Sequence, residues 1–192
     1  MQNLLKKIKK EWLKTPIKKR IINIFVFWTI ITVALLIDQL TKTQIFTNEE
    51  FKLGFLKENV HNYGIIGFRP VFHNGVTSGL HKFIGINGIH FLSFLFMIIL
   101  LFLSFWSEKI IFIITYAICF SGVLGNTIDR IAYVDYGVKD LIFLPWFDTG
   151  TFNFADIFIA VSIILVIVAT ILANVNFKNK KNNIQDDNSE KK

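Results

Sequence analysis

Five aspartates in the last third of the chain have the type and spacing for acid–base chemistry. Asp156 stands at the mouth of an otherwise apolar run, TFNFADIFIAVSIILVIVAT (151–170), where an ionised carboxylate is costly and is a candidate functional residue if it has a partner. Two carboxyls held together near hydrocarbon cannot both ionise easily, so one keeps a proton while the other can take one from water. This is the arrangement of an aspartic peptidase. Composition does not choose the second carboxyl among Asp129, Asp135, Asp140 and Asp148.

Other hydrolytic chemistries have weaker signals in this sequence. The segment TSGL (77–80) lacks the first glycine of a serine nucleophile elbow, and Lys82, four residues after Ser78, is typical of a solvated loop charge. Cys119 lies alone inside an apolar run, which excludes a disulfide framework and a cysteine metal site. We expect neither a metal nor another cofactor, since no H-E-x-x-H motif is formed by His61, His73, His81 and His90.

Four long apolar stretches must position these carboxyls. The chain has 192 residues, is 53% hydrophobic and 15% aromatic, and has a mean hydropathy of +0.50, which is a membrane composition. A helix needs about 20 apolar residues to cross a hydrocarbon core of about 30 Å. The sequence therefore predicts an all-α membrane protein whose four transmembrane helices cover 21–37, 86–106, 110–128 and 154–173.

The placement of Lys and Arg predicts the orientation. Eight of them lie in residues 1–20 and five in residues 178–192, so both termini are expected in the cytoplasm and segments 38–85 and 129–153 outside. The net charge of +7 is concentrated beside the spans, which favours anionic lipid headgroups over nucleic acid as the partner. No A-x-A-like site follows the first span, so we expect it to be retained. The polar tail 176–192 is expected to be disordered.

The outward segments carry turn signals and short strand patterns. Residues 65–73 are the best strand, and Pro70 within them indicates a sheet edge or a bulge. We therefore expect a small extracytoplasmic β-sheet. In the second segment, Phe143, Trp146 and Phe147 are suited to the lipid headgroup region.

Five motifs, in order, resemble the bacterial lipoprotein signal peptidase family (signal peptidase II). They are DQLTK (38–42), HNGVTSG (73–79), SGVLGNTIDR (121–130), GVKDL (137–141) and FNFAD (152–156), and the resemblance runs from residue 38 to about residue 173. It implies an aspartyl endopeptidase of the plasma membrane that removes signal peptides from diacylglyceryl-modified prolipoproteins, just before the lipidated cysteine. It also implies four helices with an extracytoplasmic sheet, in agreement with the spans above. We expect the enzyme to work as a monomer.

The resemblance also implies roles for individual residues. The catalytic pair would be Asp140 and Asp156, with Asp135 kept as a competitor because the stretch before GVKDL looks longer than in the family, and because Lys139 and Leu141 replace the family's Val and Phe. The supporting positions include an asparagine–glycine pair, which we assign to Asn74 and Gly75. The segment NYGIIGF (62–68) shows a similar pattern upstream and is the alternative place for this motif. The residues expected to bind substrate or support the site are Asp38, Lys42, Asn74, Gly75, Gly125, Asn126, Asp129, Arg130 and Asn153.

Two other functions are alternatives to the peptidase. In a small proton- or cation-coupled transporter, Asp140 and Asp156 would bind the ion along a path. The acids cluster at one face and no span carries a charge in mid-membrane, so a continuous relay is hard to draw. A non-catalytic adaptor that binds a partner through its sheet would leave Asp156 unexplained.

Overall fold

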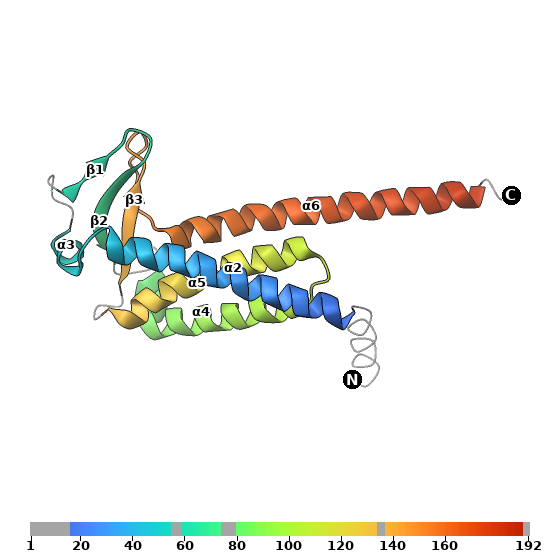
Figure 1. The fold of residues 1–192 in the computed structure, drawn as a ribbon, viewed down its shortest axis with the longest axis horizontal. Coiled ribbons are helices and arrows are strands. Elements are labelled where there is room, and N and C mark those ends of the chain that lie inside the picture. The colour runs from blue at the N-terminus through green and yellow to red at the C-terminus, as the bar shows by residue number, and fades with distance from the viewer. Residues whose placement is uncertain (1–15, 55–58, 74–79, 134–136, 190–192) are drawn as a thin grey trace.

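The chain folds into a bundle of long helices with a small sheet at one end (Figure 1). The structure, a computed structural model, describes residues 16–54, 59–73, 80–133 and 137–189, without the side chains of 80–83 and 173–189. Within these residues, four helices are long and apolar enough to cross a membrane, which confirms the predicted fold class. They are α2 (Ile17–Gln44), α4 (Leu80–Trp106), α5 (Ile110–Ala132) and α6 (Phe154–Ser189).

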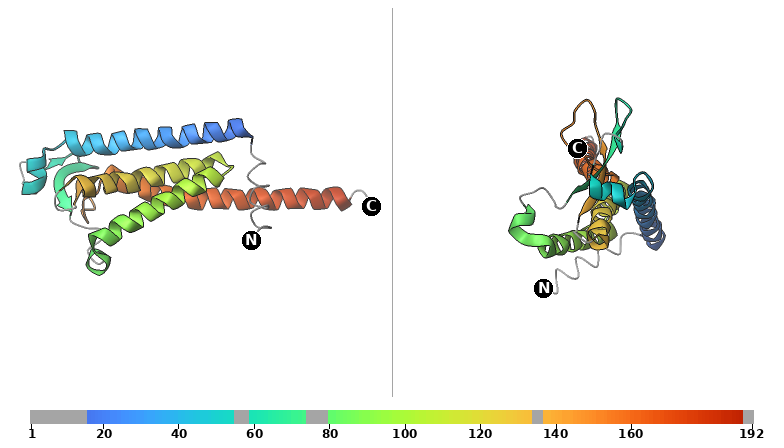
Figure 2. Two further views of the ribbon diagram at one scale, coloured as in Figure 1. Left: turned by 90° about the horizontal axis from the view of Figure 1, so that it is seen from below. Right: turned by 90° about the vertical axis from the view of Figure 1, so that its left-hand side faces the viewer.

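Helix α5 is the centre of the bundle, because it packs against each of α2, α4 and α6 (Figure 2). Phe27 of α2, Met97 of α4 and Ile113 of α5 are buried together in one apolar core. The approach of α5 to α6 is close: a β-carbon on Gly122 would lie 2.5 Å from the carbonyl oxygen of Ala155. These contacts hold the sheet ends of α2, α5 and α6 side by side.

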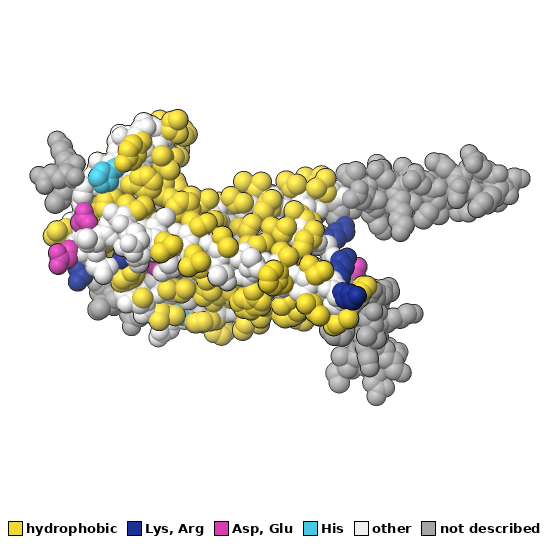
Figure 3. Space-filling view, viewed as in Figure 1, with side chains coloured by type: hydrophobic (Ala, Val, Ile, Leu, Met, Phe, Trp, Pro, Cys, Tyr) yellow, Lys and Arg dark blue, Asp and Glu magenta, His cyan; other side chains and the backbone are white. Residues whose placement is uncertain are grey.

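The outer surface of the bundle is apolar along most of its length. Figure 3 shows hydrophobic side chains over the helices, with charged side chains gathered near the two ends. On α4, Phe91, Ile98 and Phe102 are 66%, 63% and 61% exposed, respectively. Such a surface is stable in hydrocarbon, where every backbone polar group of a helix is already satisfied. The chain is a multi-pass membrane protein.

Three antiparallel strands form the sheet, in the order β1 (His61–Asn62), β2 (Gly67–His73), β3 (Val138–Phe143). The strand predicted at 65–73 is therefore confirmed as β2. The register between β2 and β3 shifts between Phe68 and Val71, so Pro70 lies at a bulge in the central strand, where its missing N–H costs no ladder hydrogen bond.

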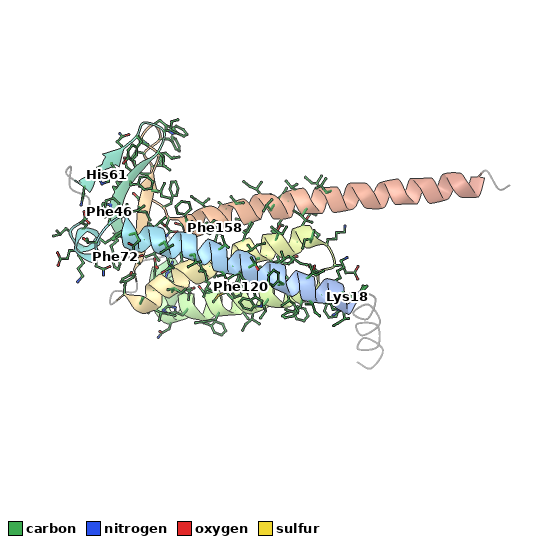
Figure 4. The ribbon with its side chains drawn as sticks, viewed as in Figure 1. Lys18, Phe46, His61, Phe72, Phe120 and Phe158 are labelled. Carbon is green, nitrogen blue, oxygen red and sulfur yellow. The ribbon has the colours of Figure 1, made fainter. Side chains whose placement is uncertain are left out.

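Strand β3 and the short helix α3 (Asn48–Leu53) were not predicted. Helix α3 begins with a capping box, in which Thr47 and Glu50 bond each other's backbone N–H groups. Phe51 of α3 packs with Phe46 and with Leu141 and Ile142 of β3 in a second core, at the sheet end of the bundle. Figure 4 labels Phe46 there beside His61, whose ring stacks on it at 5.8 Å between centroids.

One expectation was wrong, and one helix is longer than predicted. Helix α6 continues to Ser189, beyond the span predicted to end at residue 173, because no Gly or Pro follows Phe154 to end it. Phe143 is 4% exposed and lies under the Arg69 guanidinium at 4.4 Å, instead of facing lipid headgroups. Trp146 and Phe147, by contrast, are 68% and 60% exposed.

Candidate active site

The first turn of α6 is held by a reciprocal pair of hydrogen bonds that includes Asp156. The Asp156 N–H donates to Asn153 Oδ1 at 3.0 Å, and the Asn153 N–H donates to Asp156 Oδ2 at 3.2 Å. This is the capping-box arrangement, here made by an asparagine and an aspartate. The carboxylate at the mouth of the apolar run therefore lies at the positive end of the helix dipole, where a negative charge is stabilised.

Asn153 joins this turn to the carboxyl of Asp140. Its side-chain N–H₂ group donates to Asp140 Oδ1 at 2.8 Å, and it also lies 3.0 Å from Asn126 Oδ1 and 3.3 Å from the Lys139 carbonyl oxygen. Asn153 is fully buried, at 0% exposed. A single residue thus bonds both carboxyls, one on strand β3 and one on helix α6.

Backbone pairing between β3 and the residue before Asn153 brings these parts together. The Phe152 carbonyl accepts hydrogen bonds from the Leu141 and Ile142 N–H groups at 3.1 and 2.8 Å, and the Phe152 N–H donates to the Ile142 carbonyl at 2.9 Å. Leu141 and Ile142 are buried in the second core. The start of α6 is therefore fixed against the strand that carries Asp140.

The environment of Asp140 favours its protonated form. Burial, together with the nearby negative charge of Asp156, raises the pKa of Asp140 to about 7, and the Lys42 cation and the Asn153 hydrogen bond only partly oppose this. The side chain is 8% exposed. At neutral pH Asp140 therefore holds a proton for a large fraction of the time, which an ordinary aspartate does not.

A buried layer beneath the two carboxyls is built around Lys42. Its ammonium lies 2.8 Å from Asp38 Oδ2 and 3.0 Å from Asp129 Oδ2, and each of these three side chains is 1% exposed. Asp38 Oδ1 accepts a hydrogen bond from the Ala155 N–H at 2.9 Å, so it satisfies a second free N–H group of the α6 N-terminus. Asp38 thereby ties the end of α2 to the helix that carries Asp156.

Asn126 of α5 connects this layer to Asp156. Its amide donates to Asp156 Oδ1 at 2.8 Å, and its Oδ1 atom accepts from Lys42 at 3.3 Å. The backbone carbonyl of Asn126 accepts from Arg130 Nη1 at 3.2 Å, and the buried Arg130 Nε has no hydrogen-bond partner within the described part of the chain.

The match to known families decides which activity the chain has. Residues 30–172 match the peptidase family described as Signal peptidase (SPase) II. The chain belongs to the signal peptidase II family. Its members are aspartic peptidases that remove signal peptides from prolipoproteins, and the chain is therefore a membrane hydrolase with this activity.

Relatives agree with this assignment to signal peptidase II, and a solved structure shares the fold. The chain is 31% identical over 143 residues to a lipoprotein signal peptidase of Helicobacter pylori, covering 72% of this chain and 86% of that one. It is 25% identical over 163 residues to one of Campylobacter jejuni, covering 82% and 92%. A bacterial membrane enzyme solved by the in meso method at 2.3 Å has the same fold, with a TM-score of 0.63, 23% identity and coverage of 78% and 90%.

Most of the residues expected from the signal peptidase II resemblance come together at this site. Gly125 is there because a β-carbon would lie 2.6 Å from Asp38 Oδ2, so only glycine leaves room for that carboxylate. Three expected or competing residues, Asn74, Gly75 and Asp135, lie outside the described residues. The residues that the structure brings together are Asp38, Lys42, Gly125, Asn126, Asp129, Arg130, Asp140, Asn153 and Asp156.

Sequence reasoning missed one residue of the site and did not anticipate the surroundings of another. Gln39 donates to Asp38 Oδ2 at 3.0 Å and to Asp129 Oδ1 at 3.1 Å, and its position inside DQLTK was the available signal. Lys139, noted only as a departure from the family pattern, is 2% exposed and lies 2.6 Å from Asn48 Oδ1 of α3. Its ammonium therefore contacts α3, and the presence of lysine at position 139 does not prevent the contact between Asp140 and Asn153.

Proposed function

We propose that Asp140 and Asp156 are the catalytic dyad of this signal peptidase II family member. The observation that carries the proposal is the hydrogen bonding of both carboxyls by Asn153, at 2.8 Å to Asp140 and 3.2 Å to Asp156. The different surroundings of the two carboxyls support different roles. Asp140 has a pKa raised to about 7 by burial and by the charge of Asp156, whereas both oxygens of Asp156 accept hydrogen bonds, as an ionised carboxylate does.

In the proposed mechanism the two carboxyls exchange roles. Ionised Asp156 takes a proton from a water molecule, whose oxygen attacks the scissile carbonyl carbon, while protonated Asp140 gives its proton to the carbonyl oxygen. The tetrahedral diol then collapses: Asp156 gives its proton to the leaving amine, and Asp140 recovers a proton from a diol hydroxyl. Both carboxyls return to their starting states, and one water is consumed.

The substrate we propose is a prolipoprotein whose cysteine already carries a diacylglyceryl group, cut just before that cysteine. Such a substrate stays in the bilayer, because moving its acyl chains out of hydrocarbon costs about 0.8 kcal/mol per CH₂. It is therefore expected to reach the dyad sideways from the lipid. The protein would lie in the cell membrane, with both termini in the cytoplasm and the sheet end of the bundle facing outward, because eight Lys and Arg residues precede residue 21. We expect it to act as a monomer.

Cleavage of a diacylglyceryl prolipoprotein peptide, followed as a gel shift, tests the dyad. Asp140→Asn and Asp156→Asn should abolish cleavage, whereas the control Asp148→Asn should not, because Asp148 is a partly exposed partner of Arg69. Loss of cleavage in Asp135→Asn with retention in Asp140→Asn would move the first carboxyl to residue 135. Equal cleavage of the unlipidated precursor in detergent would refute the proposed substrate selection.

A further inference from the structure

A recess lies at the end of the bundle opposite the proposed dyad. It is formed between the first turns of α2 and the last turn of α4, and its cavity volume is about 140 Å³. Arg20 and Asp38 are both on α2 and are separated by roughly 27 Å at 1.5 Å per residue. The recess is therefore near the other membrane surface and cannot hold the scissile peptide.

The polar α2 residues that line the recess, Arg20 and Asn23, precede its aromatic residues along that helix. Arg20, other residues of one face of α2 and the end of α4 contribute to it, so that the guanidinium of Arg20 belongs to its lining. Phe27 and Trp28, about two turns further along α2, line the apolar part together with Phe105 of α4. This order matches a molecule with an anionic head and an apolar tail.

The charge around the rim is strongly positive. Lys18, Lys19 and Arg20 lie on α2, and Glu108 and Lys109 lie in the turn after α4, which makes four cations against one acid among the described residues at this end. Figure 3 shows Lys and Arg side chains gathered there, and Figure 4 labels Lys18. Basic pockets between transmembrane helices bind the headgroups of anionic lipids.

We propose that this recess binds one anionic phospholipid, whose phosphate contacts Arg20 and one of whose acyl chains lies between α2 and α4 toward Phe27. The substrate's own signal peptide fits less well, because its basic first segment would meet like charges here. A second copy of the chain would bring the same cations together. The lipid would also fill a weakly packed joint, since α2 packs mainly against α5 and only lightly against α4.

Lipid retention by the full-length protein tests this site independently of the dyad. The protein is exchanged into mixed phosphatidylcholine and phosphatidylglycerol, extracted, and weighed by native mass spectrometry. We expect one retained phosphatidylglycerol per protein in preference to phosphatidylcholine. Arg20→Gln should lower this retention about ten-fold more than Lys19→Gln, since both remove one charge at the same end but only Arg20 lines the recess.

Two further variants separate the site from a general attraction to the membrane. Arg20→Lys keeps the cation and should retain most of the binding, whereas Ser104→Leu fills the apolar part without changing charge and should lower retention. Equal losses in Arg20→Gln and Lys19→Gln, or equal retention of both lipids by the wild type, would overturn the proposal. Displacement of the lipid by a prolipoprotein signal peptide would assign the recess to substrate and also overturn it.

Discussion

Replacing Gly125 by alanine tests whether Asp38 holds the start of α6 in place. The added β-carbon would lie 2.6 Å from Asp38 Oδ2 and 3.2 Å from the Ala155 β-carbon. Neither neighbour can withdraw freely. Asp38 is 1% exposed and paired with Lys42, and Ala155 is 0% exposed. The substitution therefore has to displace Asp38 or push α6 away from α5.

The expected change in the free energy of unfolding follows from three contributions. Alanine is a better helix former than glycine by about 1 kcal/mol, which stabilises the variant. Overpacking costs about 1–3 kcal/mol, and disturbing the charged hydrogen bond from the Ala155 N–H to Asp38 costs about 1.5–3 kcal/mol. The net effect is a loss of about 1.5–5 kcal/mol in Gly125→Ala.

Chemical denaturation in detergent and prolipoprotein cleavage measure the two consequences. Gly150→Ala is the matched control, because a β-carbon there meets nothing within 4 Å. We expect Gly125→Ala to be less stable than this control and to cleave on the order of 100-fold more slowly, since a shift of about 1 Å in a reacting group has that effect. If Gly125→Ala and Gly150→Ala matched each other in both measurements, Asp38 could not be positioning α6 as described.

Three other substitutions give distinct outcomes. Asn153→Ala removes the residue that bonds both carboxyls and should lower kcat on the order of 100-fold, while circular dichroism shows that the protein stays folded. An unchanged kcat would refute the positioning role of Asn153. Lys42→Met leaves two buried aspartates without their cation and should cost about 3–5 kcal/mol of unfolding free energy. The control Lys139→Met should cost less, because the Lys139 ammonium has no carboxylate within salt-bridge distance among the described residues. Folding raises the pKa of Asp140 to about 7, so the native protein binds more protons than the unfolded chain between about pH 4 and 7. The free energy of unfolding should therefore fall on the order of 4 kcal/mol as the pH rises through that window. Asp140→Asn should remove this slope in pH-dependent denaturation, and an unchanged slope would contradict the assigned pKa.

The transmembrane helices were predictable because their signal is local. Each span is a long apolar run, and Asp156 near the start of the fourth is the one charged residue in the four predicted segments, so length and composition alone located these spans. Strand β3 was not predictable in the same way. Its sequence VKDLIF shows no alternation of apolar and polar residues, because every one of its side chains is buried in the fold, including Lys139 and Asp140. Such burial depends on β2, α3 and the start of α6, which lie far apart in the sequence.

The site was predictable only where its signal is local, as it is for the helices. Asp38 and Lys42 are four residues apart, a spacing that places two side chains on one face of a helix, and they form an ion pair at 2.8 Å. The spacing of the acids left Asp156 with several partners, and only the resemblance to a family favoured Asp140. Asn153 reaches both carboxyls because the preceding residue, Phe152, pairs with β3, and no local sequence pattern predicts that contact.

The pH dependence of kcat/KM for lipidated prolipoprotein cleavage tests most directly whether Asp140 and Asp156 share one catalytic proton. The dyad predicts a bell-shaped profile that reports the two carboxyls as a coupled pair. Its basic limb should begin near pH 7, where Asp140 loses the proton that it must give to the scissile carbonyl. A rate that stayed constant from about pH 6 to about pH 9 would contradict the shared proton, because no protonated carboxyl of this pair could then be required.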